Sequence, residues 1–314
     1  MATSDATDSR LDRFRDRMTP WLIGLRRTWD QFTESPLGLV GLFILAAIGF
    51  TAVFAPYLAP HSLDWQAYGG NPSFDQASSL PHPPVFGDPF FAPLGTDSMG
   101  HGILTQLIYG SRTALYIGLA AGLLSSLVGV PVGIVSGYYS DTKIDEGIQR
   151  IIDVMYGLPF LPLVIVLVFV RGVTTTNIIL AIVVKSWLNN AIVIRGQVMS
   201  LSERPFVEAA RASGASDLRI MGRHIVPNIL PIGFVYLAQD AAFAILIQAS
   251  LAFLGLADFT DISWGTMLQW IQVEGYVYTA PWWLIPPGVM IALLAASFYF
   301  IGYSLEDVMN PGGR

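Results

Sequence analysis

Six apolar stretches, each long enough to cross a lipid bilayer as a helix, constrain the fold of this chain more than any other feature. A transmembrane helix needs about 20 apolar residues, and the stretches lie near residues 37–58, 113–137, 152–170, 174–194, 229–252 and 282–303. Only 13% of the 314 residues are charged, whereas a soluble domain carries about 25%. The sequence therefore predicts an all-α membrane protein with six transmembrane helices.

The polar residues before the first span do not resemble a signal peptide. The first 35 residues contain several arginines and lack the apolar core of a cleaved secretory signal. From Leu11 to Phe32 an apolar residue recurs every three or four positions, which predicts an amphipathic helix along the inner membrane surface. We therefore expect the first span to remain as a membrane anchor.

Basic residues predict which side of the membrane each loop faces, because cytoplasmic loops carry the excess of Lys and Arg. If six helices alternate in direction, one side receives most of these residues: Arg10, Arg13, Arg15, Arg17, Arg26, Arg27, Lys143, Arg150, Arg195, Arg204, Arg211, Arg219, Arg223 and Arg314. The opposite side has Arg112 and Arg171 at helix ends, and its loops are acidic. Both termini and the loop between the fourth and fifth spans are therefore predicted to be cytoplasmic, in a multi-pass protein of the cell membrane.

Two long segments are predicted on the outer side. Residues 59–112 are rich in Pro, Gly, Asp and Ser, so we interpret them as an external segment that ends in a short interfacial helix near 99–111. Residues 255–281 and the start of the last span carry four tryptophans: Trp264, Trp270, Trp282 and Trp283. Because tryptophan favours the headgroup level, we expect these side chains to anchor the interface or to contact an external partner.

Small residues form a stripe along the second span at spacings of three or four positions: Gly118, Gly122, Ser126, Gly129, Gly133 and Gly137. In lipid, small residues let two helix backbones approach closely. The stripe predicts a tightly packed bundle, and Pro131 predicts a kink in the span.

The charged loop between the fourth and fifth spans has the start and stop signals of a helical hairpin. Pro205 suits a first helical turn, and Gly214 supplies a stop because glycine accepts the left-handed conformation. Ser216 is expected to cap a second helix. The loop is therefore predicted to project into the cytoplasm as a short helix, a tight reversal and a second helix.

This loop contains Glu208-Ala209-Ala210, a glycine four residues later and Pro227, and it resembles the EAA loop of binding-protein-dependent ABC permeases. Val226 stands where that pattern usually has Leu. Further motifs are similar to those of the C-type permease subunit of dipeptide, oligopeptide and nickel importers: Leu94-Gly95-Thr96-Asp97, Gly137-Tyr138-Tyr139, Leu158-Pro159, Ser263-Trp264-Gly265, Trp282-Trp283 and Pro286-Pro287-Gly288. Gly100-His101-Gly102 departs from the family's usual GRD.

The resemblance covers roughly residues 36–311 and implies a type I ABC importer permease fold. It divides the chain into a cytoplasmic N-terminal segment with an amphipathic helix (1–35), a first transmembrane helix with the external segment (36–109), the permease core (110–305) and a cytoplasmic tail (306–314). It also implies a coupling helix near 204–217 that seats in a cleft of an ATPase, through Arg204, Phe206, Glu208, Ala209, Ala210, Arg211 and Gly214. We expect the Glu208 carboxylate to pin the loop itself rather than to bond to the ATPase.

The same resemblance implies an assembly in the lipid membrane. Its partners would be a homologous permease subunit, two ATP-binding subunits and an extracytoplasmic solute-binding protein. ATP and Mg would bind to the ATPase subunits, and no cofactor is expected in this chain. Peptides are the expected cargo by resemblance, and nickel and oligosaccharides remain open.

Lys185 and Asp240 lie inside predicted spans, where ionisable residues are costly and mark functional sites. Their depths are similar, which suggests a buried ion pair or a shared polar cavity. The alternative is that Lys185 extends toward the inner surface while Asp240 faces the translocation path alone. Gln248 stands where the family often has Glu and is a third candidate for lining the path.

Other function classes lack the residues that they require. Neither Lys143 nor Lys185 follows a glycine, so the chain has no Walker A loop. There is no cysteine, the four histidines lack paired zinc spacing, and a net charge of −6 gives no nucleic-acid signal. A secondary transporter, the alternative function, would need carboxylates in several spans, and only Asp240 lies deep. No catalytic constellation of a membrane enzyme is present.

We predict that Gly214→Asp leaves the protein in the membrane but abolishes transport, because the substitution strains the reversal of the coupling loop and adds a charge to it. Quantification of the protein in isolated membranes, together with solute uptake, measures both effects. Normal uptake by this variant would argue against the coupling role.

Overall fold

The computed structural model describes residues 32–63, 81–84, 86, 92–258 and 261–309, and the predicted N-terminal amphipathic helix lies outside them. The described chain is almost entirely helical, with one isolated antiparallel bridge between Thr96 and Gly102. The helices are α2 (Pro36–Val53), α3 (Ala55–Leu58), α4 (Ile103–Tyr138), α5 (Lys143–Tyr156), α6 (Phe160–Arg171), α7 (Thr175–Ser202), α8 (Pro205–Ala212), α9 (Asp217–Ile220), the π-helical turn η1 (Met221–Ile225), α10 (Val226–Phe253), α11 (Trp264–Val273) and α12 (Pro281–Met309). The predicted all-α class is therefore confirmed.

Five helices are long and apolar enough to cross a membrane, and α5 with α6 forms a sixth, broken span bent by 87°. Contacts at the two ends of the bundle show that this pair makes a crossing. Tyr138 at the end of α4 bonds to Asp217 before α10, whereas Thr175 at the start of α7 bonds to Asp261 beyond the far end of α10. Between α4 and α7 the chain must therefore pass from one end to the other. Leu158 and Pro159 lie in the break between the two helices, because proline disfavours a helical conformation of the residue before it.

Helix α4 corrects one expectation. Its 36 residues run without interruption from Ile103 to Tyr138, so no separate interfacial helix forms near 99–111. Arg112, which suggested a helix end, instead donates from Nε to the carbonyl of Ala52 at 2.6 Å and from Nη2 to that of Val53 at 3.2 Å. The charge thus satisfies carbonyls at the end of α2, which have no partner within their own helix.

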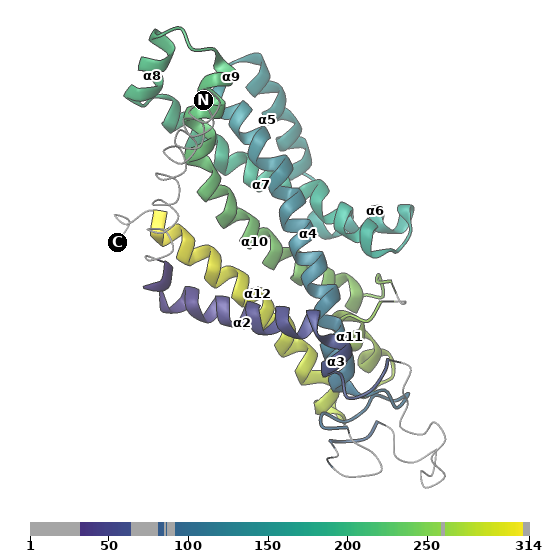
Figure 1. The fold of residues 1–314 in the computed structure, drawn as a ribbon. Coiled ribbons are helices and arrows are strands. Elements are labelled where there is room, and N and C mark those ends of the chain that lie inside the picture. The colour runs from purple at the N-terminus through teal and green to yellow at the C-terminus, as the bar shows by residue number, and fades with distance from the viewer. Residues whose placement is uncertain (1–31, 64–80, 85, 87–91, 259–260, 310–314) are drawn as a thin grey trace, which may run out of the picture.

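The glycine stripe of α4 is a packing face, as predicted. A β-carbon on Gly129, Gly133 or Gly137 would lie 2.5–2.7 Å from a backbone carbonyl oxygen of α7. Gly118 and Gly122 face α10 in the same way, with Leu237 O only 2.7 Å from a β-carbon on Gly122. Figure 1 shows that α4 runs along most of the bundle.

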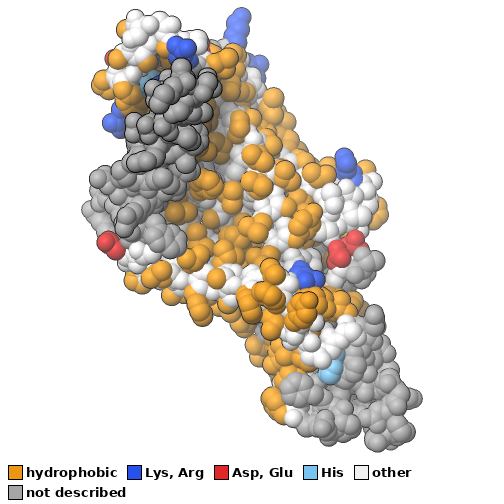
Figure 2. Space-filling view, in the orientation of Figure 1, with side chains coloured by type: hydrophobic (Ala, Val, Ile, Leu, Met, Phe, Trp, Pro, Cys, Tyr) orange, Lys and Arg blue, Asp and Glu red, His pale blue; other side chains and the backbone are white. Residues whose placement is uncertain are grey.

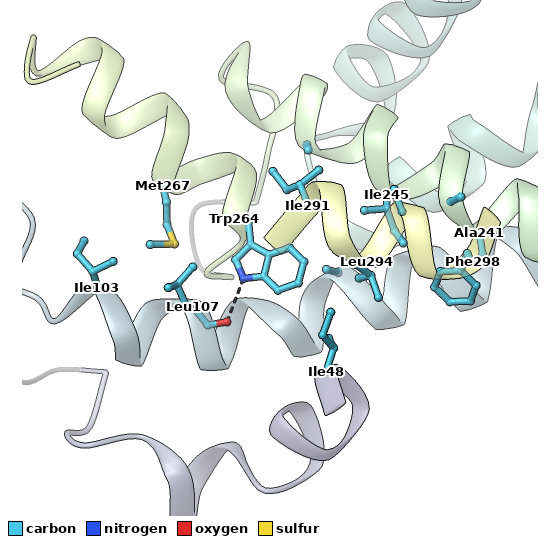
Figure 3. Close-up of a cluster of buried hydrophobic side chains, with 14 of the residues drawn as sticks. Ile48, Ile103, Leu107, Ala241, Ile245, Trp264, Met267, Ile291, Leu294 and Phe298 are labelled. Carbon is cyan, nitrogen blue, oxygen red and sulfur yellow. Dashed lines mark hydrogen bonds between the residues drawn. The ribbon is translucent and has the colours of Figure 1, made fainter. Parts of the chain in front are cut away.

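A second core lies where α2, α4, α10, α11 and α12 meet, and Figure 3 shows Trp264 at its centre. The indole nitrogen of Trp264 donates to the carbonyl of Leu107 at 2.9 Å. Trp264 is 2% exposed and Trp283 0% exposed, so the interfacial role predicted for these two side chains is wrong. The reason is that α11 folds back into the bundle. Trp270 and Trp282 are partly buried against the same core.

The described part of the external segment is organised around Asp97, which is 1% exposed. One carboxylate oxygen accepts the backbone N–H groups of Met99 and His101 at 2.9 and 2.8 Å. The other accepts the side-chain amide of Gln106 at 2.8 Å. The aspartate of the Leu94–Asp97 motif therefore holds the turn that leads into α4.

The surface is consistent with a membrane protein. Figure 2 shows hydrophobic side chains over much of the middle of one face, with Lys and Arg side chains at the end that carries α8. Many large apolar side chains on the helices are exposed, for example Phe43 at 75% and Phe169 at 77%.

We predict that Gly129→Ala destabilises the protein by about 1–3 kcal/mol, because the added methyl group would lie 2.5 Å from Trp187 O and the helices would have to separate. The midpoint of thermal unfolding of the purified protein in detergent measures the change.

Gly196→Ala in α7 is the matched control. No atom lies within 4 Å of its β-carbon position, and alanine favours a helix over glycine by about 0.5–1 kcal/mol. Equal effects of the two substitutions would contradict the close approach of α4 and α7.

Candidate functional site

The predicted hairpin is present as α8, a tight turn and α9, and Figure 1 shows α8 standing out from one end of the bundle. Pro205 begins α8, as the sequence indicated. Val207 is fully buried and packs in a cluster with Ile220 and Ile225, which fixes the hairpin to the start of α10. The hairpin is thus a projecting element with its own apolar anchor.

Gly214 closes α8 with a Schellman motif. Its φ angle is +79°, its N–H bonds to Arg211 O at 3.0 Å, and the N–H of Ala215 bonds to Ala210 O at 3.1 Å. Ala210 and Ala215 both pack against the apolar cluster under the hairpin. Ser216 precedes α9 but makes no side-chain capping bond, so that expectation is wrong.

The outer face of the hairpin exposes most of the predicted coupling residues. Phe206 is 44% exposed and Leu218 is 79% exposed. Five further coupling residues are exposed as well: Arg204, Glu208, Ala209, Arg211 and Gly214. Within the described residues, the Glu208 carboxylate makes no hydrogen bond or ion pair, so the internal role expected for it has no partner here. Exposed apolar side chains among charged residues make a surface suited to protein contact.

Contacts tie the hairpin to the end of α4. Asp217 accepts hydrogen bonds from the hydroxyls of Tyr138 at 2.7 Å and Tyr139 at 3.1 Å. The Arg211 guanidinium lies 5.9 Å from the ring centroid of Tyr138. A displacement of the hairpin would therefore pull on the same helix that packs against α7 and α10.

A buried network next to the hairpin was not predicted from the sequence. Asp145, 4% exposed, accepts bonds from Nε and Nη2 of Arg195 at 2.8 and 2.7 Å and from the Ser136 hydroxyl at 2.6 Å. The network joins α4, α5 and α7 at the end of the bundle that carries the hairpin. The sequence analysis counts Arg195 only among the basic residues of the cytoplasmic side. The pair joins residues 50 positions apart on different helices, and no local pattern signals it.

Lys185 and Asp240 share a cavity of about 410 Å³ lined by residues of α5, α6, α7, α10 and α12: Tyr156, Phe160, Lys185, Ser186, Asn189, Gln239, Asp240, Phe243 and Tyr299. The suggested ion pair is not among the described contacts. Asp240 accepts a hydrogen bond from Asn190 at 2.7 Å, and the Lys185 ammonium donates to the carbonyl of Leu158. The structure therefore has Lys185 and Asp240 in a shared cavity and not in an ion pair.

Gln248 does not line this cavity. It is 5% exposed and its amide donates to the Ser263 hydroxyl at 3.2 Å. The start of α11 covers it, so its predicted place on the translocation path is not supported. Among the described residues, no group of three His, Asp or Glu side chains is placed to hold a metal ion.

Two family models together match most of the chain. The family model for the binding-protein-dependent transport system inner membrane component matches residues 129–314. A model for the N-terminal TM domain of oligopeptide transport permease C matches residues 25–81.

Two curated relatives illustrate the similarity. The dipeptide transport system permease protein DppC of Bacillus subtilis is 33% identical, over 93% of this chain and 87% of the relative. The oligopeptide transport system permease protein OppC of Haemophilus influenzae is 30% identical, over 97% of this chain and 95% of the relative.

A solved structure shares the fold. A chain of the methionine ABC transporter MetNI, in an inward-facing conformation, superposes with a TM-score of 0.52 at 19% identity, over 67% of this chain and 97% of that chain. At this identity the likeness concerns the fold alone, and it agrees with the type I importer architecture predicted for the core.

We predict that Arg195→Met destabilises the protein by more than the double change Asp145→Asn with Arg195→Met. Removal of one partner leaves a buried charge without compensation, which costs up to about 3–5 kcal/mol in a fully buried pair. The cost is smaller here because Arg195 is 26% exposed. Unfolding midpoints of the single and double variants measure the difference.

Arg150→Met is the matched control, since Arg150 pairs with Glu146 where both side chains are exposed, at 76% and 61%. Such a pair contributes about 0–1 kcal/mol. If the Arg195 and Arg150 variants behaved alike, the Asp145 network would have no special structural role.

Proposed function

Because this chain belongs to the family of binding-protein-dependent transport system inner membrane components, we propose that it is the membrane-spanning permease subunit of an ATP-driven importer of peptides. Full-length relatives named for dipeptide and oligopeptide transport support the peptide cargo over nickel or oligosaccharides. The single observation that carries the mechanism is the projecting hairpin of α8 and α9, which joins an exposed face to the transmembrane helices. The chain is a transport component and not an enzyme.

In this proposal the exposed face of α8 seats in an ATPase subunit. Coupling requires two global states that make different contacts at both sites. Phe206 and Leu218 would provide apolar contact, and Arg204, Glu208 and Arg211 would provide polar contacts. The Glu208 carboxylate would contact the ATPase, since no described side chain or backbone group of its own chain binds it.

Two routes lead from α8 into the membrane. The first passes from Asp217 through Tyr138 and Tyr139 to α4. The second passes from the end of α7, which precedes α8 by two residues, through the Arg195–Asp145 pair to α5. Through these contacts, a shift of the ATPase would tilt α4, α5 and α7 together.

The assembly would contain a homologous permease subunit, two ATP-binding subunits and an extracytoplasmic solute-binding protein. ATP and Mg would be held by the ATP-binding subunits. The basic residues near α5 and α8 favour the cytoplasm for that end of the bundle. Both termini would then lie in the cytoplasm, and residues 59–112 and α11 would face the binding protein.

We predict that Phe206→Asp weakens association with the ATPase at least tenfold, because a carboxylate would replace an exposed apolar side chain of α8. Co-purification of the ATPase with the tagged permease measures association. ATP-dependent peptide uptake into proteoliposomes measures function.

Tyr278→Asp serves as the control, since Tyr278 is 96% exposed but lies between α11 and α12, far along the chain from the hairpin. This variant should retain the ATPase. Full ATPase binding and uptake by Phe206→Asp would refute α8 as the docking element.

A further inference from the structure

The cavity between α7 and α10 carries two opposite charges that do not pair with each other. Asp240 is 8% exposed, and its Oδ2 accepts one hydrogen bond, from Asn190. Its other oxygen receives no hydrogen bond from any described residue, although an ionised carboxylate can accept about four. Burying a charge with so little compensation is costly, which marks Asp240 as a binding group rather than a structural one.

The Lys185 ammonium likewise makes fewer hydrogen bonds than it can. Its ammonium donates to the carbonyl of Leu158, at the break between α5 and α6, and lies 6.0 Å from the ring centroid of Tyr156. An ammonium group has three donors. The contact with Leu158 uses one, so donors remain for an anionic group inside the cavity.

The remaining walls suit an organic solute of modest size. Asn189 and Gln239 add amide groups, and Phe160 and Phe243 pack edge to face at 5.1 Å. The volume of about 410 Å³ lies within the range of about 300–1,000 Å³ typical of small-molecule sites. Amides can bond to a peptide unit, and aromatic rings can contact apolar side chains.

We propose that this cavity is a binding site for a short free peptide within the permease, with the peptide's α-ammonium on Asp240 and its α-carboxylate on Lys185. A neutral sugar would leave both protein charges without a partner, and a lone cation would satisfy only Asp240. A zwitterion satisfies both. This inference rests on the proposed function, and it adds a recognition site that is separate from the binding protein.

The test uses the purified permease–ATPase complex in detergent without its binding protein, so that selection by that protein does not enter. Binding of Ala-Phe, N-acetyl-Ala-Phe and Ala-Phe-amide is measured by calorimetry. In the unmodified complex, acetylation and amidation should each weaken binding at least tenfold.

Variants assign each peptide terminus to its residue. Asp240→Asn has nearly the same shape and can still accept from Asn190; it should bind Ala-Phe at least tenfold more weakly, and acetylation should then have no further effect. Lys185→Met should behave in the same way toward amidation. Each variant should keep its sensitivity to the other modification, so that Asp240→Asn still distinguishes the amide and Lys185→Met still distinguishes the acetylated peptide. This residue-specific non-additivity is the signature of direct contact, because a general loss of folding would remove both sensitivities together.

Asp153→Asn and Lys143→Met are the matched controls, because both side chains are exposed on α5 and neither lines the cavity. They should keep the discrimination of the unmodified complex. No detectable binding of Ala-Phe to the unmodified complex, or an unchanged effect of acetylation in Asp240→Asn and of amidation in Lys185→Met, would overturn the site.

Failure of this inference is distinguishable from failure of the proposed function. If the cavity does not bind the peptide but the complete transporter with its binding protein still takes up Ala-Phe with ATP, only the cavity assignment is wrong. If the ATPase does not associate through α8, the proposed function is wrong whatever the cavity binds.

Discussion

The close approach of the α4 backbone to α7 and α10 is the constraint on which the rest of the structure depends. Lipid supplies no hydrophobic drive between helices, so contact between backbones must hold them together. The glycines of α4 remove the β-carbons that would keep carbonyl oxygens of the neighbouring helices at a distance. Because α4 spans the bundle, it also connects the Trp264 core at one end to the hairpin of α8 and α9 at the other. In the proposed coupling role, movement at the hairpin would reach the bundle through α4.

Polar groups inside the bundle divide into two kinds. Asp97, Arg112 and Asp145 are satisfied by several partners within the chain. Asp97 fixes the turn into α4, and Arg112 and Asp145 each fix a junction between helices. Lys185 and Asp240 have few partners and line a common cavity instead. The first kind stabilises the fold. Lys185 and Asp240, the second kind, keep free donors and acceptors that a ligand could use. This contrast is the physical basis for proposing that they bind the solute.

Much of the fold was accessible from local patterns. The apolar runs predicted the spans, the glycine spacing predicted the packing face of α4, and Gly214 predicted the reversal after α8. The errors arose where a residue type has two common environments. Arg112 suggested a helix end but caps a neighbouring helix, and Trp264 suggested an interface but fills a core. Sequence alone does not distinguish these, because the choice depends on which helix lies beside the residue.

The sequence by itself determined the membrane class, the crossings of the bundle and the hairpin between the fourth and fifth spans, because hydropathy, chain length and glycine conformation are local properties. Only the tertiary structure decided that Asp145 meets Arg195, that Gln248 lies under α11, and that Lys185 and Asp240 share a cavity without forming an ion pair. These relations join residues up to 55 positions apart in sequence across the faces of different helices. Helix rotation and crossing set such contacts, and these follow from the packing of the whole bundle.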